Sequence, residues 1–176
     1  MGFDLESSYF CKAVRTLCYV TESAWESRCV VFRSFGFSDS EILSMFKKLP
    51  HIMSYSEKIL NEKMEFFLNK MQWTPLRLLS SPVVLDYSLK KRTIPRCSVL
   101  QVLVSKNRTS ESYMLSTLLV MSEKKFIKHF VTAHKDEVPG VVKAYQGKLT
   151  FDEYTFKQKR HKDEIRSSPD ILVNQS

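Results

Sequence analysis

The feature that most constrains the fold of this chain is a short phrase that occurs twice, 32 residues apart. KLPHIMSYS spans residues 48–56 and SPVVLDYS spans residues 81–88, so that both contain P-x-[IV]-[ML]-x-Y-S. Proline lacks an amide hydrogen and disfavours helix at the residue before it, so each copy should end one helix and lead to the next. A repeat of this length is typical of α-solenoids, in which each unit buries its apolar face only against its neighbours.

The segments around both copies have the apolar periodicity and the capping residues of helices. Thr21, Ser38 and Ser56 occupy expected N-caps, and Glu41 follows Ser38 at the spacing of a capping box. Gly36 is suited to end a helix, because glycine adopts left-handed backbone angles without penalty. We expect helices over residues 4–19, 21–35, 38–49, 57–73, 75–81 and 89–107, the last starting in earnest near Pro95, then two helices divided near Ser122 and a short piece ending at Gly147. In the 57–73 helix, the side chains expected to be buried are Ile59, Met64, Phe67 and Met71.

Composition supports an all-α fold. Hydrophobic residues make up 43% of the chain, which excludes disorder for most of it. Only 4 of the 176 residues are glycine, and tight hairpins need glycine-rich turns, so an all-β fold is disfavoured. We divide the chain into an N-terminal helix and partial repeat (1–20), a repeat array (21–148) and a polar, disordered tail (149–176).

The same sequence argues against several classes of protein. No apolar run is long enough to cross a membrane, and the start, MGFDLESSYFCKAV, resembles neither a secretory signal nor a transit peptide. We interpret the four cysteines (Cys11, Cys18, Cys29 and Cys97) as reduced, buried thiols. The four histidines are too scattered for a metal site, and no glycine-rich phosphate loop or nucleophile motif is present. We therefore expect no catalytic residue, no metal and no cofactor.

Positive charge is concentrated in one quarter of the chain. The net charge is +8, and residues 66–110 contain eight cations against Asp86 alone. Such an excess is expected of a polyanion-binding surface, although a solvated basic face would look the same. The candidate nucleic-acid-binding residues are Lys70, Arg77, Lys90, Lys91, Arg92, Arg96, Lys106 and Arg108.

Arg92 and Arg96 are four residues apart and should share one helical face. Guanidinium groups bind phosphate oxygens in a bidentate manner. Alternatively, one of these arginines donates hydrogen bonds to carbonyls at the end of the preceding helix, or pairs with Asp86. For Arg96 both readings stay open, whereas Lys90, Lys91 and Arg92 are the stronger phosphate candidates.

An ordered set of motifs gives a resemblance to a known family. GFSDSEI at 36–42, SPVVLDYSLKKRTIPR at 81–96 and FIKHFV followed by DEVP at 126–139 occur in that order. In this arrangement they resemble the C-terminal half of a plant mitochondrial transcription termination factor (mTERF) family protein, over roughly residues 15–148. The matching positions are Pro50 and Pro82 as repeat punctuation, Tyr87 and Leu89 in packing, and Arg92, Pro95 and Arg96.

The resemblance implies an all-α, left-handed superhelix of repeats, each made of two helices and a short 3-10 helix, with a concave basic face. It implies a monomer without membrane association that binds double-stranded DNA in a mitochondrion or chloroplast and regulates transcription, above all its termination. Binding of structured intron RNA in splicing and a protein-interaction scaffold are the alternatives. The chain lacks several N-terminal repeats of the family pattern, so a truncated product that does not bind is a further alternative.

Overall fold

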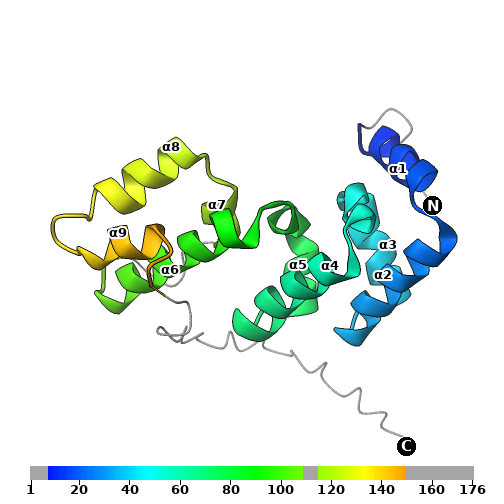
Figure 1. Ribbon diagram of the computed structural model, residues 1–176, viewed down its shortest axis with the longest axis horizontal. Coiled ribbons are helices and arrows are strands. Elements are labelled where there is room, and N and C mark those ends of the chain that lie inside the picture. The colour runs from blue at the N-terminus through cyan, green and yellow to red at the C-terminus, as the bar shows by residue number, and fades with distance from the viewer. Residues whose placement is uncertain (1–7, 109–114, 150–176) are drawn as a thin grey trace, which may run out of the picture.

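The computed structural model describes residues 8–108 and 115–149, and these residues form helices and turns without a strand. The first three helices are α1 (Ser8–Tyr19), α2 (Glu22–Ser34) and α3 (Asp39–Lys48). They lie at one end of an elongated molecule, and the last helices lie at the other end (Figure 1). The all-α prediction is therefore confirmed.

Each copy of the repeated phrase forms a short 3-10 helix, η1 (Pro50–Ser54) and η3 (Pro82–Asp86). In both, the proline is the first residue, and the isoleucine or valine two positions later is fully buried. A long helix follows each connector. The first consists of α4 (Glu57–Met64) and a π-helical end, η2 (Glu65–Lys70), and the second of a π-helical start, η4 (Leu89–Thr93), and α6 (Ile94–Ser105).

Shorter helices complete the array. They are α5 (Pro75–Ser80), α7 (Leu115–Val120), α8 (Glu123–Phe126) with its π-helical extension η5 (Ile127–Thr132), and α9 (Gly140–Tyr145). A long helix, a short helix and a connector thus recur along the chain. Figure 1 shows α4, α5 and α7 between the two ends.

The predicted caps are confirmed. The hydroxyls of Thr21, Ser38 and Ser56 accept hydrogen bonds from the backbone N–H three residues later, and the Glu41 carboxylate closes the capping box. Gly36 has φ of +86° and ends α2, as its position predicts. The helix begins in full at Leu89 and not near Pro95. Its first segment, η4, is π-helical, and this wider turn accommodates Pro95, which lacks an amide hydrogen and whose ring crowds the preceding turn.

Two predictions about burial are wrong. Ile59 was expected inside, but its side chain is 43% exposed, because Leu60 and Met64 take the buried face of α4. Of the four cysteines, Cys29 and Cys97 are buried as expected, whereas Cys11 and Cys18 are exposed on α1. The predicted tail after residue 149 lies outside the described residues, as does Leu5 at the start of the first predicted helix.

Candidate nucleic-acid interface

Arg92 and Arg96 lie on η4 and at the start of α6, and both guanidinium groups are turned toward α7. Arg96 is fully buried, and its Nη1 donates to carbonyl oxygens of residues 118, 119 and 121 at 2.6–3.1 Å. Arg92 donates to the carbonyls of residues 119–121 at 2.7–3.2 Å. The last carbonyls of a helix have no partner within the helix. The two arginines therefore cap the C-terminus of α7.

Further contacts fix Arg96 in place. Its Nη2 forms an ion pair with the Glu123 carboxylate at 2.5 Å, and the guanidinium lies 4.6 Å from the centre of the Phe126 ring. The Tyr145 hydroxyl donates to the other oxygen of Glu123. Burial raises the pKa of Glu123, but the hydrogen bonds from Tyr145 and Arg96 outweigh it and hold that pKa below its ordinary value.

These contacts favour the structural reading of Arg96 that the sequence left open. The sequence suggested the end of the preceding helix as the target, but the carbonyls belong to the following helix, α7. Neither arginine pairs with Asp86. Arg96 cannot reach a phosphate while it is buried, and Arg92 is partly buried, with its guanidinium 4.0 Å from the centre of the Tyr87 ring.

Cations in the earlier repeats make the same kind of contact. Arg28 Nε donates to the carbonyl of Tyr55 at 3.0 Å, and Lys63 Nζ donates to the carbonyl of Tyr87 at 2.7 Å. These two tyrosines are the equivalent positions of the repeated phrase. Lys48 similarly donates to the carbonyl at position 79, near the end of α5. Each contact joins one repeat to the next, and we call the Arg28–Tyr55 and Lys63–Tyr87 contacts the inter-repeat latches.

The inter-repeat latches have a recognisable sequence pattern. Lys63 is buried, and desolvation lowers its pKa. Its acceptor belongs to a motif that occurs twice, and a cation lies on the second α-helix upstream of each copy, Arg28 on α2 and Lys63 on α4.

Asp86, the only acid of the basic quarter, joins the two connectors. Its carboxylate is hydrogen-bonded to the His51 ring and, at 3.3 Å, to the Tyr55 hydroxyl. Burial and the nearby carboxylate raise the pKa of Tyr55 to about 12. Asp86 therefore holds η1 to η3.

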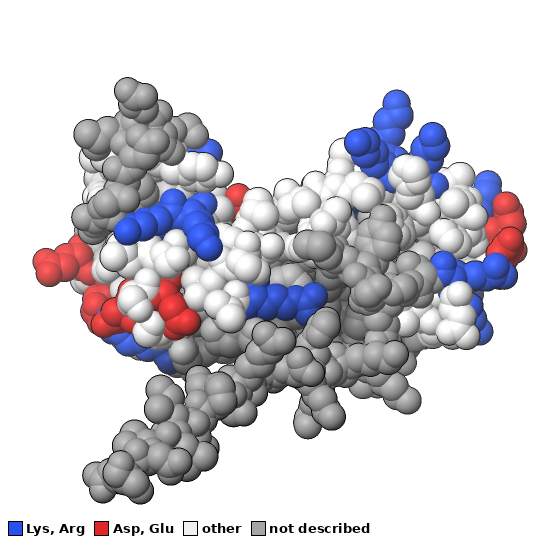
Figure 2. All heavy atoms as spheres, turned by 180° about the vertical axis from the view of Figure 1, so that it is seen from behind, with Lys and Arg blue, Asp and Glu red and all other residues white. Residues whose placement is uncertain are grey.

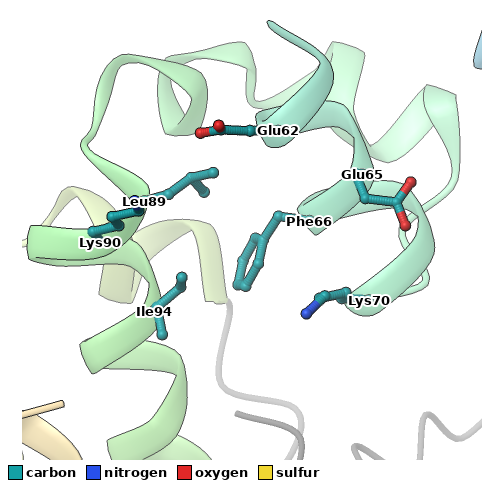
Figure 3. A pocket seen from close by; sticks show the side chains of 7 residues that line it. All are labelled: Glu62, Glu65, Phe66, Lys70, Leu89, Lys90 and Ile94. Atoms are coloured by element: carbon teal, nitrogen blue, oxygen red, sulfur yellow. The ribbon is translucent and has the colours of Figure 1, made fainter. Parts of the chain in front are cut away.

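Lys70 and Lys90 line opposite sides of an open groove between η2 and η4 (Figure 3). The groove has a volume of about 280 Å³, and its floor is formed by Phe66, Leu89 and Ile94. Two carboxylates, Glu62 and Glu65, line the same groove. Its charge is thus mixed, which makes it less favourable for a polyanion than the lysines alone suggest.

The remaining candidates are exposed, but they differ in the contacts that their charged groups make within the protein. Arg77 is exposed, with its guanidinium 4.5 Å from the centre of the Trp73 ring, and Arg108 forms an exposed ion pair with Glu137 at 2.9 Å. Lys90, Lys91 and Lys106 are exposed, and none of them forms an ion pair within residues 8–108 and 115–149.

The charge distribution of one face is visible in Figure 2. Cations occur at several separate places on this face, and a group of them projects at the rim over α8. The hollow between the two ends of the molecule shows mainly uncharged residues. The cations on this face are therefore not gathered into a single stripe.

The described part of the chain contains no group of three or more His, Cys, Asp or Glu side chains placed to hold a metal ion. None of its helices is long and apolar enough to span a bilayer.

Comparisons with known proteins point to one family. A family model described as mTERF matches residues 6–127. The chain is also 32% identical over 98 residues to the protein named transcription termination factor MTERF8, chloroplastic, of Arabidopsis thaliana, a match that covers 56% of this chain and 19% of that relative. The chain therefore spans about a fifth of the length of this relative. No solved structure matches it at a significant level.

Proposed function

Because this chain belongs to the mTERF family, we propose that it binds double-stranded DNA in a plant organelle and regulates transcription there, most directly its termination. Family membership carries the coarser part of this proposal, which is nucleic-acid binding in organellar gene expression. The name of the relative, a chloroplastic transcription termination factor, supports termination as the specific role.

The observation that carries the proposal is the positive charge left after the internal contacts are made. Lys90, Lys91 and Lys106 are exposed, and Asp86 is held by His51 and Tyr55. Such lysines can reach phosphate oxygens and release the counterions condensed on a duplex. Contacts of this kind position a protein on DNA without reading its sequence.

Binding of the purified chain to duplex DNA and to structured RNA over a salt series tests this proposal. The informative variant is Lys90→Ala with Lys91→Ala, which leaves Arg92 to cap α7. Its matched control is Lys12→Ala with Lys58→Ala, two exposed lysines on α1 and α4. We expect the first variant to flatten the dependence of log K on log salt by about 1.8, which is two contacts at about 0.9 each.

The two polymers separate the candidate functions. Tighter binding of duplex DNA supports a role in transcription, whereas tighter binding of RNA supports the splicing role. If the folded chain binds neither polymer, the proposal is wrong, and a scaffold role or a truncated, non-binding product is left.

A further inference from the structure

One strongly charged surface lies outside the candidates that the sequence singled out. Lys124, Lys125 and Lys128 are exposed on one side of the helix formed by α8 and η5. The opposite side is buried through Phe126 and Phe130. We call the three lysines the α8 lysine face. Figure 2 shows cations projecting from the rim of the molecule over this helix.

The charge of the α8 lysine face is not compensated locally. Glu123, the one acid of this helix, is paired with Arg96 and accepts a hydrogen bond from Tyr145. Glu137, which follows η5, is paired with Arg108. In the part of the chain that the structure describes, none of the three lysines forms an ion pair.

The face is also held in a fixed place. The Ser122 hydroxyl caps α8 by accepting from the N–H of Lys125, and the Arg96–Glu123 ion pair ties the first residue of α8 to α6. Lysines on an anchored helix lose less conformational freedom on binding than lysines on a flexible tail, because their backbone is already ordered.

We propose that the α8 lysine face is a second contact surface for the phosphate backbone of a nucleic-acid duplex. This inference rests on the proposed function and adds a site to it. Lys124 and Lys128 are separated by about 6 Å along the helix, which is close to two steps of the roughly 3.4 Å axial spacing between charges along one strand of a duplex. Their flexible stems let the ammonium groups follow a regular row of phosphates.

The composition of the face favours a duplex over other polyanions. Proteins that bind single strands stack bases on exposed aromatic rings, and the described residues of α8 and η5 expose no Phe, Tyr or Trp. A helix that binds a membrane surface needs exposed apolar residues beside its lysines. The apolar residues here are buried or partly buried.

The test compares two variants that each remove three positive charges. One carries Lys124→Gln, Lys125→Gln and Lys128→Gln. The matched control carries Lys12→Gln, Arg15→Gln and Lys58→Gln, three exposed cations on α1 and α4, both of which lie apart from α8 in Figure 1. Both are measured against the unaltered chain for binding to a labelled DNA duplex over a salt series, and far-UV circular dichroism checks that each is folded.

The α8 variant should have a salt slope shallower by about 2.7, and its affinity near 0.1 M salt should fall on the order of 10²-fold. The control should stay within about one contact, 0.9, of the unaltered slope. Equal slopes for all three proteins overturn the inference and leave the proposed function intact. If the control variant loses as much of the slope as the α8 variant, the effect is due to net charge, and the inference is also overturned. If the unaltered chain does not bind, the proposed function fails first. Preference for anionic vesicles over the duplex contradicts the inference as well.

Discussion

Replacing Arg96 by alanine separates the two roles that the sequence left open for this residue. Its side chain is fully buried and donates to three backbone carbonyls and to Glu123. The replacement leaves these carbonyls without their donor and removes the partner of the carboxylate. Removing one partner of a buried ion pair costs about 3–5 kcal/mol. Because the side chain of Glu123 is 49% exposed, water can resolvate it, so we expect the lower end, about 3 kcal/mol.

Urea unfolding followed by far-UV circular dichroism measures this loss. A domain of ordinary stability unfolds with about 5–15 kcal/mol, so the variant should show a clearly lower midpoint with a similar slope. Lys91→Ala, an exposed lysine on η4, is the control and should change stability by no more than about 0.5 kcal/mol. Arg96→Lys should be intermediate, because one ammonium group cannot span both the carbonyls and the carboxylate.

The result that refutes this reasoning is a loss below about 1 kcal/mol, comparable to a surface substitution. If Arg96 contacts phosphate instead, Arg96→Ala keeps its stability and loses affinity for nucleic acid. The two roles therefore predict opposite pairs of results from one variant.

Three further predictions concern the Lys63 latch, the stability of the protein at acid pH and the turn at Gly36. Lys63→Met removes the donor to the Tyr87 carbonyl and should cost about 1.5–3 kcal/mol of unfolding free energy in urea titrations, and an unchanged midpoint would refute the latch. The folded-state pKa of Glu123 is lowered, so its stabilisation is present above its ordinary pKa of 4.5 and is lost as the pH falls through the folded-state value. Glu123→Gln should therefore be less stable at neutral pH and should show a smaller fall in stability below about pH 4.5, whereas parallel profiles would contradict this. Gly36→Ala should cost about 1–2 kcal/mol of unfolding free energy, because its φ of +86° is unfavourable for alanine. An added Cβ meets no atom within 4 Å, so no steric clash contributes. An unchanged midpoint in thermal unfolding would argue against backbone strain.

Local features of the fold could be read from the sequence because their causes are local. The capping box at Ser38, the turn at Gly36 and the two proline-initiated connectors each depend on a few neighbouring residues. Periodicity also placed Phe67 in the core, but it misassigned Ile59, since which side of a short helix is buried depends on the helices packed against it.

The candidate site was harder to predict, because a cation in the sequence does not reveal what it contacts. Arg96 and Lys63 have helical spacings that fit an exposed face, yet their partners are carbonyls more than 20 residues away. Those partners are brought near only when the repeats stack. The α8 lysine face was missed because its lysines lie outside the basic quarter, and the sequence predicts only that two helices divide near Ser122.

Binding through exposed lysines is tested best by the affinity of the folded chain for a DNA duplex as a function of salt. We expect binding whose log K falls linearly with log salt, with a slope near −0.9 for each phosphate contact. We also expect a shallower slope when Lys90 and Lys91 are replaced. A folded chain that does not bind the duplex, or binds it with no dependence on salt, would contradict the claim that this mTERF family member acts through its exposed lysines.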